Sequence, residues 1–133
     1  MRLKETSIEY RVPYADTDQM KVVYYANYLV YFERVRNEIM RKDGLTYRKF
    51  EEDGYFLPAA EAHVEYHRPS QYDDLLTIRG WISLAKGCRL KIDYEVKRGD
   101  DLLVTGYTVH ALINKTGKPC RFPRKMLEWM DID

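Results

Sequence analysis

The chain is 133 residues long and 45% hydrophobic, which fits a single globular domain over residues 1–133 with a modest core. Its 22 basic residues nearly balance 21 acidic ones, and this excludes the strongly basic surface of many nucleic-acid-binding proteins. No stretch approaches the roughly 20 apolar residues that cross a bilayer. We therefore expect no membrane span and no nucleic-acid partner.

The N-terminus and the cysteines bear on the compartment. The charged first residues are followed by no apolar run, so no secretory signal is expected. The two cysteines, Cys88 and Cys120, have neither the spacing of a zinc site nor that of a disulfide framework. The sequence therefore predicts a cytoplasmic protein that needs no metal or redox cofactor.

The first predicted element is a strand. Residues 4–12 alternate between apolar and polar, with Ile8, Tyr10 and Val12 on one face. Residues 13–24 break this alternation and contain a proline and two aspartates, which predicts a loop.

The strongest helical pattern covers residues 25–43. Its apolar side chains recur at steps of three and four residues and form one stripe. That stripe consists of Tyr28, Phe32, Val35 and Ile39, widened by Leu29 and Met40. Asn27 is expected to cap the start of this helix, and Gly44 to end it in a left-handed conformation. A second, short helix is expected at residues 46–53.

After Pro58 the rest of the chain is strand-like. Four alternating segments, separated by turn sequences, are found at residues 60–67, 76–82, 90–96 and 102–114. Short turns favour antiparallel neighbours, because parallel strands need a long crossover. The fold class is therefore α+β, with one long helix across one face of an antiparallel sheet. A lone sheet of this size leaves edges to cover, which favours self-association.

The residues with the clearest chemical potential lie just before the long helix. Asp16 and Asp18 occupy a loop that ends where the helix begins, and a helix start offers free N–H groups and a partial positive charge. A carboxylate facing that pole across a carbonyl group could attack the carbon or activate a water molecule. Spacing alone favours ordinary turn or capping aspartates, since such residues are common in loops.

The same stretch resembles the signature of the 4-hydroxybenzoyl-CoA thioesterase family and its Tol–Pal-associated bacterial relatives. The matching residues are Tyr14, Asp16, Thr17, Asp18, Val22, Val23, Tyr24, Asn27 and Tyr28. Further segments that resemble the family are residues 64–69, 72–75 and 121–123. The resemblance covers nearly the whole chain.

The resemblance implies a hotdog fold, in which a curved antiparallel β-sheet wraps around one long α-helix. It also implies a dimer with sites at the subunit interface, assembled further into a homotetramer. The implied activity is hydrolysis of an acyl-CoA thioester to a free carboxylic acid and coenzyme A. Asp18 falls on the catalytic aspartate, as nucleophile or general base, and Tyr25 falls where a backbone N–H polarises the thioester carbonyl.

Two positions depart from the family pattern. Lys21 stands in a gap where many relatives carry glycine, and a position that needs a positive φ would resist lysine. Tyr25 stands where the Tol–Pal-associated relatives carry histidine, although the 4-hydroxybenzoyl enzyme is similar to this chain there. Either departure would alter the substrate range or weaken the activity.

Several other residues are candidates for binding or catalysis. Lys86, Arg89 and Arg121 are expected to meet the phosphates of coenzyme A, and a solvated charged surface is the alternative. Glu33 and Glu38 on the helix are alternative catalytic carboxylates, because some other hotdog enzymes use that position. Two histidines, His63 and His67, would lie roughly 13 Å apart on a strand, too far to share a metal ion.

Two other functions remain open from the sequence. One is hydrolysis of acyl groups carried by acyl carrier protein. The other is a non-catalytic hotdog subunit that binds acyl-CoA or a partner protein, an alternative that the departures at Lys21 and Tyr25 keep open.

Overall fold

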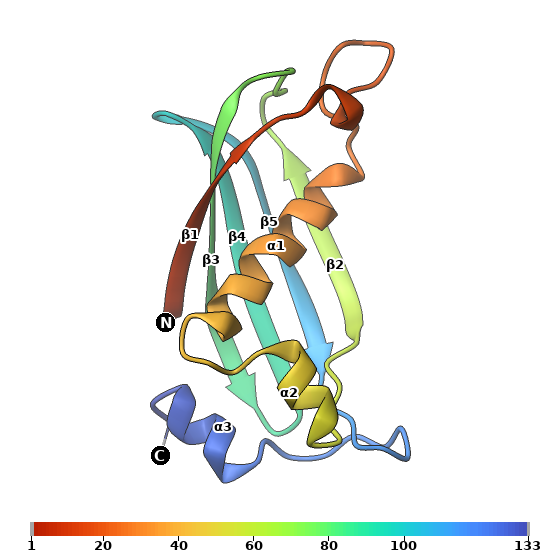
Figure 1. Cartoon of the computed structure of the whole chain (residues 1–133), viewed down its shortest axis with the longest axis vertical. Coiled ribbons are helices and arrows are strands. Elements are labelled where there is room, and N and C mark those ends of the chain that lie inside the picture. The colour runs from red at the N-terminus through yellow and green to blue at the C-terminus, as the bar shows by residue number, and fades with distance from the viewer. Residues whose placement is uncertain (1, 133) are drawn as a thin grey trace.

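One long helix lies across one face of a five-stranded antiparallel sheet in the computed structural model (Figure 1). The structure describes residues 2–132 and, at residue 47, the backbone alone. The strands are β1 (Leu3–Arg11), β2 (Ala59–Tyr66), β3 (Leu75–Lys86), β4 (Arg89–Arg98) and β5 (Asp101–Ala111). The helical elements are η1 (Tyr14–Asp16), α1 (Asn27–Arg41), α2 (Tyr47–Glu52) and α3 (Arg124–Trp129). Within the described part of the chain, no helix is both long and apolar enough to cross a membrane.

The strand order is β1-β3-β4-β5-β2. As the short turns predicted, β3, β4 and β5 are antiparallel neighbours. The same rule is wrong for β2, which pairs with β5 rather than with β3. The segment between β2 and β3 therefore carries the chain from one edge of the sheet to a position beside β1, and it passes the start of α1 on the way (Figure 1).

Both ends of the long helix differ in detail from the prediction. Asn27 is not the cap, because Ala26 is the N-cap residue and no side chain caps the helix. Asn27 instead opens the helix and donates its side-chain amide to the carbonyl oxygen of Asp16 at 2.9 Å. The expectation for Gly44 is confirmed, since its φ is +80° just beyond the last turn.

The C-terminal helix was missed. The sequence after Pro58 predicted strands alone, yet α3 forms directly after Pro123, its N-cap residue. Met126 and Met130 lie four residues apart and are both buried against the core, which is the signal that the strand interpretation overlooked.

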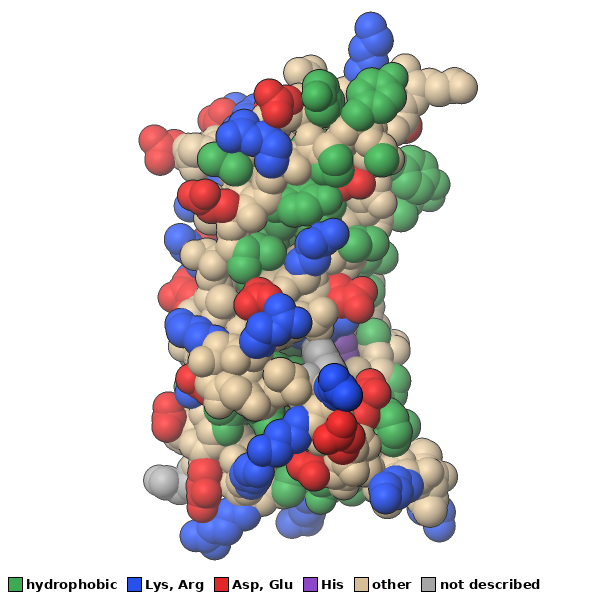
Figure 2. All heavy atoms as spheres, viewed as in Figure 1, with side chains coloured by type: hydrophobic (Ala, Val, Ile, Leu, Met, Phe, Trp, Pro, Cys, Tyr) green, Lys and Arg blue, Asp and Glu red, His purple; other side chains and the backbone are tan. Residues whose placement is uncertain are grey.

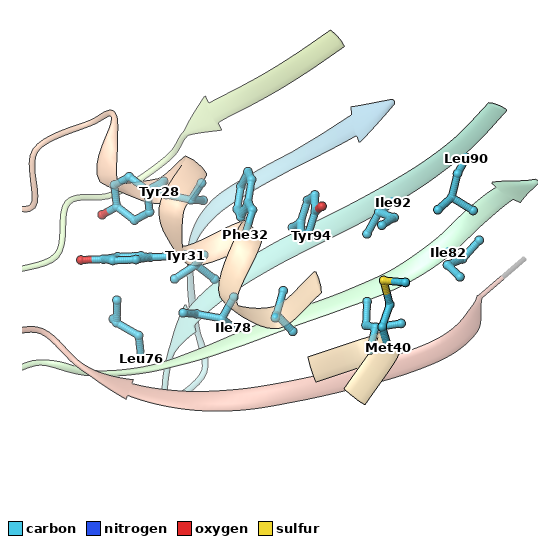
Figure 3. Packing of buried hydrophobic residues seen from close by; sticks show 14 of the residues in the cluster. Tyr28, Tyr31, Phe32, Met40, Leu76, Ile78, Ile82, Leu90, Ile92 and Tyr94 are labelled. Atoms are coloured by element: carbon cyan, nitrogen blue, oxygen red, sulfur yellow. The ribbon is translucent and has the colours of Figure 1, made fainter. Parts of the chain in front are cut away.

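The core lies between α1 and the concave face of the sheet (Figure 3). Phe32 stacks on Tyr94 of β4 with ring centroids 4.3 Å apart. Gly106 of β5 permits this approach, because a Cβ there would lie 2.7 Å from the Phe32 ring. The helix contributes the buried side chains Tyr28, Tyr31, Phe32, Val35, Ile39 and Met40.

The opposite face of the sheet is polar and bears paired charges. In β4, buried residues alternate with partly exposed charged ones such as Asp93 and Glu95. The guanidinium of Arg79 lies 3.0 Å from the Glu95 carboxylate, and the ammonium of Lys91 lies 4.5 Å from the centre of the Tyr107 ring. This face therefore meets water without exposing a continuous apolar surface.

A chain of polar groups runs through the core beneath α1. His110 is 1% exposed, and one ring nitrogen lies 3.0 Å from the carbonyl oxygen of Leu57, so it carries the proton. Its other ring nitrogen accepts from Thr108 at 2.8 Å, and the Thr108 hydroxyl lies 2.7 Å from that of Tyr94. Burial and then the charge of Arg36 lower the pKa of His110 to about 4.

This histidine makes stability depend on pH. Its ordinary pKa is 6.5 and its folded pKa is about 4, so between these values the unfolded chain binds a proton that the folded chain does not. We expect the free energy of unfolding to fall by about 3 kcal/mol from this group as the pH drops through that window. Urea unfolding of wild type and His110→Asn from pH 7 to pH 4 measures the difference in slope. An unchanged slope in His110→Asn would contradict the assignment.

Candidate active site

The loop before α1 folds into a tight hairpin, here called the Asp18 hairpin (residues 16–24). The amide of Asp18 donates to the carbonyl oxygen of Val22 at 3.0 Å, and the amide of Tyr24 donates to that of Asp16 at 2.9 Å. These bonds join the segment that carries Asp18 to the segment that leads into the helix. The hairpin thus ties the backbone at Asp18 to the stretch that leads directly to Tyr25.

Asp18 is half-buried at the turn of this hairpin. One carboxylate oxygen accepts from the amide of Met20 at 2.8 Å, so the turn-forming role that the sequence left open is real. The other oxygen has no protein partner among residues 2–132. The Tyr25 side chain and, in addition, the Asp18 charge raise the pKa of the Tyr24 phenol, which lies close to both. Asp18 therefore retains one carboxylate oxygen for a ligand.

Lys21 adopts a φ of +67° in the same turn. Few residues other than glycine adopt this left-handed conformation, because the Cβ approaches the following carbonyl. The gap in which many relatives carry glycine therefore does contain a residue with a positive φ. Lysine occupies it without opening the hairpin, and its side chain is exposed.

The backbone just before α1 offers available donors. The N–H groups of Tyr25 and Ala26 bond to no group within residues 2–132, whereas the amides from Asn27 onward bond within the turn. The carbonyl oxygen of Tyr25 accepts from the Tyr66 hydroxyl at 3.0 Å, which fixes the orientation of this stretch of backbone. The positive end of the helix dipole adds to the electropositive character of this N–H.

A cavity of about 260 Å³ opens beside this donor. Its lining is largely apolar and aromatic, and it includes the side chains of one histidine and one arginine. The lining residues are Val22, Val23, Tyr25, Tyr28, Tyr66, His67, Arg68 and Pro69. The rings of Tyr25 and Tyr28 both make edge contacts with that of Tyr66, at 6.4 and 5.7 Å between centroids. Sequence reasoning did not assign this wall, although the match of residues 64–69 to the family pattern pointed to it.

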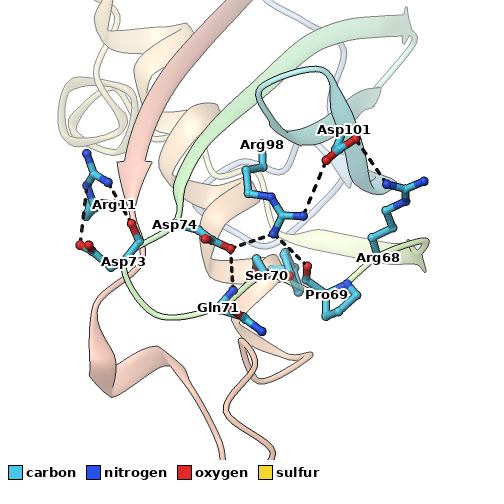
Figure 4. A network of polar contacts seen from close by, with 10 residues as sticks. Arg11, Arg68, Pro69, Ser70, Gln71, Asp73, Asp74, Arg98 and Asp101 are labelled. Atoms are coloured by element: carbon cyan, nitrogen blue, oxygen red, sulfur yellow. Dashed lines mark hydrogen bonds and ion pairs between the residues drawn. The ribbon is translucent and has the colours of Figure 1, made fainter.

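The far wall of the cavity is anchored by charged groups (Figure 4). The guanidinium of Arg98 lies 2.9 Å from the Asp74 carboxylate, which accepts from the amide of Gln71 at 2.8 Å. The adjacent Ser70 carbonyl accepts from the amide of Val23 at 2.8 Å. This network joins the β2–β3 segment to the Asp18 hairpin.

Exposed apolar side chains surround the same end of the molecule. Figure 2 shows hydrophobic groups gathered at the upper end, over the start of α1, while charged groups dominate the lower half. The exposed apolar residues of this region are Tyr14, Met20, Tyr24, Tyr25, Leu29 and Val30. Such a patch beside a cavity is typical of a binding surface.

The predicted phosphate-binding residues lie at the other end of the sheet. Lys86 and Arg89 flank the β3–β4 turn, and a bond from the Phe122 amide to Gly87 brings Arg121 beside them. Strand β3 separates this cluster from the Asp18 hairpin by roughly 36 Å at ~3.3 Å per residue. Within one chain the structure thus groups the three basic residues together, but away from Asp18 and Tyr25.

The alternative candidates have other surroundings. Glu33 is exposed on α1, and Glu38 pairs with Arg41 one turn further along the helix. His63 and His67 are both exposed at the edge of the sheet. Among residues 2–132, no group of three or more histidine, cysteine, aspartate or glutamate side chains is arranged to hold a metal ion.

Known proteins share both the sequence pattern and the architecture. The family model described as the thioesterase-like superfamily matches residues 12–130. The acyl-CoA thioesterase YbgC of Haemophilus influenzae is 32% identical over 123 residues, which cover 90% of this chain and 90% of that protein.

Two solved structures extend the likeness to three dimensions. DHNA-CoA thioesterase from Staphylococcus aureus is 29% identical with a TM-score of 0.87, over 96% of this chain and 87% of that one. Protein TT1821 from Thermus thermophilus, described as hypothetical, is 28% identical with a TM-score of 0.90, over 95% and 97% of the two chains.

The curved sheet around one long helix, with these relatives, defines a hotdog-fold protein of the thioesterase class. The chain belongs to the thioesterase-like superfamily, as the resemblance of its N-terminal motif predicted.

The left-handed lysine leads to a stability prediction. Lys21→Gly should raise the free energy of unfolding by up to about 1 kcal/mol, because relief of backbone strain exceeds the added entropy of the unfolded chain. Chemical denaturation at pH 7 measures this change. Lys118→Gly, at an exposed lysine without a positive φ, should give no gain. A loss of stability in Lys21→Gly would show that the strain is absent.

Proposed function

We propose that this chain hydrolyses acyl-CoA thioesters, with Asp18 as the catalytic carboxylate and the Tyr25 N–H as the oxyanion donor. The observation that carries the proposal is the Asp18 hairpin, which joins a carboxylate with one unpaired oxygen to a helix start with an unpaired N–H. The name of the related YbgC protein, an acyl-CoA thioesterase, supports coenzyme A as the carrier.

The substrate carbonyl would lie in the cavity with its oxygen toward the Tyr25 N–H. Charge that develops on this oxygen is stabilised by the fixed donor and by the helix dipole. No rearrangement of the backbone is required, because the Tyr24 carbonyl, which shares a peptide unit with the Tyr25 N–H, already accepts from the Asn27 amide at 2.9 Å.

Asp18 would act at the carbonyl carbon in one of two ways. As nucleophile, its carboxylate forms an acyl anhydride and expels the coenzyme A thiolate, and water then hydrolyses the anhydride. As general base, it accepts a proton from the attacking water, and the thiolate leaves with the same result. Both routes yield one carboxylic acid and one thiol.

We also propose that the chain works as a homo-oligomer built on β2. This edge strand pairs only with β5 within residues 2–132, and almost all of its side chains are exposed. An eight-residue strand with an open backbone edge is a ready surface for a second copy. In an antiparallel pair, the basic cluster of Lys86, Arg89 and Arg121 of one chain would serve the site of the other.

The proposed location is the cytoplasm. Both Cys88 and Cys120 are free thiols, a state that fits a reducing compartment.

Asp18→Asn should lower thiol release from acyl-CoA by at least about 10³-fold, because the amide is neither a nucleophile nor a base. A thiol-trapping assay over short, long, branched and aromatic acyl-CoAs measures it, with circular dichroism as the folding check. Glu33→Gln is the matched control: it removes the alternative carboxylate on α1 and should retain wild-type turnover.

Three results would contradict this proposal. Retained turnover in Asp18→Asn would remove that carboxylate from the chemistry. Tight acyl-CoA binding by wild type without thiol release would favour a non-catalytic binding subunit. If an acyl group is released from acyl carrier protein but not from coenzyme A, the carrier in the substrate is acyl carrier protein.

Light scattering tests the assembly. A dimer of dimers should elute with four times the mass of one chain, and its specific activity should fall on dilution if the chains separate. A mass of two chains would keep the β2 pairing but remove the tetramer. A mass of one chain with full activity would contradict the shared site.

A further inference from the structure

Asp16 lies at a junction of three elements. One oxygen of its carboxylate accepts two hydrogen bonds, from the hydroxyl of Tyr10 at 2.8 Å and from that of Tyr31 at 2.7 Å. Tyr10 belongs to β1 and Tyr31 to the buried face of α1. The two rings are themselves in contact, with centroids 4.8 Å apart.

The backbone of Asp16 is held from a further side. Its carbonyl oxygen accepts from the amide of Tyr24 at 2.9 Å and from the side-chain amide of Asn27 at 2.9 Å. Asp16 therefore receives four hydrogen bonds, and the donors come from β1, from the end of the Asp18 hairpin and from two turns of α1.

We infer that Asp16 is a positioning residue, and that with Tyr10 and Tyr31 it sets the distance between the Asp18 carboxylate and the start of α1. This inference rests on the proposed function of the same site. Asp18 is two residues further along the chain, and the Asp18 hairpin has few other ties to α1. A hairpin fastened to both β1 and α1 cannot pivot away from the Tyr25 N–H.

The chemistry of the junction fits this role. Hydrogen bonds to an ionised carboxylate are short and strong, and two donors on one oxygen fix its place closely. Burial and the adjacent Asp16 charge raise the pKa of Tyr31, and burial and the same charge raise that of Tyr10. Both phenols therefore stay protonated and remain donors throughout the neutral range.

The sequence motif contains two aspartates with different surroundings. One oxygen of Asp16 is occupied by two phenols, whereas Asp18 keeps an oxygen without a protein partner in the described chain. Asp16 therefore has a structural role, and Asp18 remains available to the substrate.

The test removes the two donors together and leaves the rings in place. In the double variant Tyr10→Phe with Tyr31→Phe, kcat should fall on the order of 10- to 100-fold with KM nearly unchanged, because small misplacement of a reacting group has effects of this size. Asp16→Ala should behave likewise. Asp16→Asn keeps an acceptor for both phenols and should restore kcat to within roughly threefold of wild type, unlike Asp18→Asn.

Tyr94→Phe is the matched control, since Tyr94 is an equally buried phenol that bonds to Thr108 in the core. It should lose stability without losing kcat. Equal loss of kcat in this variant would mean that general destabilisation, and not the junction, lowers turnover. An unchanged kcat in the double variant would overturn the inference, as would an effect confined to KM.

Amide hydrogen exchange gives a readout that needs no substrate. The double variant should exchange faster across the Asp18 hairpin than wild type, whereas Tyr94→Phe should not. Unchanged exchange there would overturn the positioning role even if the proposed hydrolysis holds. Conversely, faster exchange in the double variant, together with no thiol release by wild type, would support the positioning role of Asp16 but contradict the proposed function.

Discussion

The burial of one face of α1 against the concave side of the sheet is the constraint on which the rest of the molecule depends. Phe32 can stack on Tyr94 only because Gly106 leaves room for its ring. Once the buried face of α1 is packed against the sheet, the helix cannot slide or rotate without losing these contacts. The position of the helix start, and of the Tyr25 N–H just before it, then depends on residues that do not line the cavity.

The candidate site combines this rigid element with a short hairpin. Val23 is the one residue of the hairpin that is buried in the core, and hydrogen bonds to the surroundings hold the rest of the hairpin. Asp16 connects it to β1 and α1, and Ser70 connects it to the segment that enters β3. Arg98 and Asp74 hold that segment in turn. Polar contacts thus help to locate the Asp18 carboxylate, while apolar packing locates the start of α1.

Periodicity in the sequence predicted the long helix and the strands, because their buried faces repeat at 3.6 or 2 residues. It did not predict the pairing of β2 with β5, since strand order depends on contacts between distant segments. The short α3 helix offered only one pair of methionines as a signal. For the site, family resemblance predicted Asp18 and Tyr25, and both stay predictions. The cavity wall at Tyr66 and Arg68 was missed because it forms only when β2 crosses to the far edge.

The alternation along β4 has a consequence for how the chain tolerates insertions. Ile92, Tyr94 and Val96 face the helix, while Lys91, Asp93 and Glu95 face water. Adding or removing one residue within this central strand would exchange the two sets and carry three charges into the core. Insertions and deletions should therefore accumulate at the turns around Gly87 and Gly99. An extra residue there does not change which side chains of the strand face the helix.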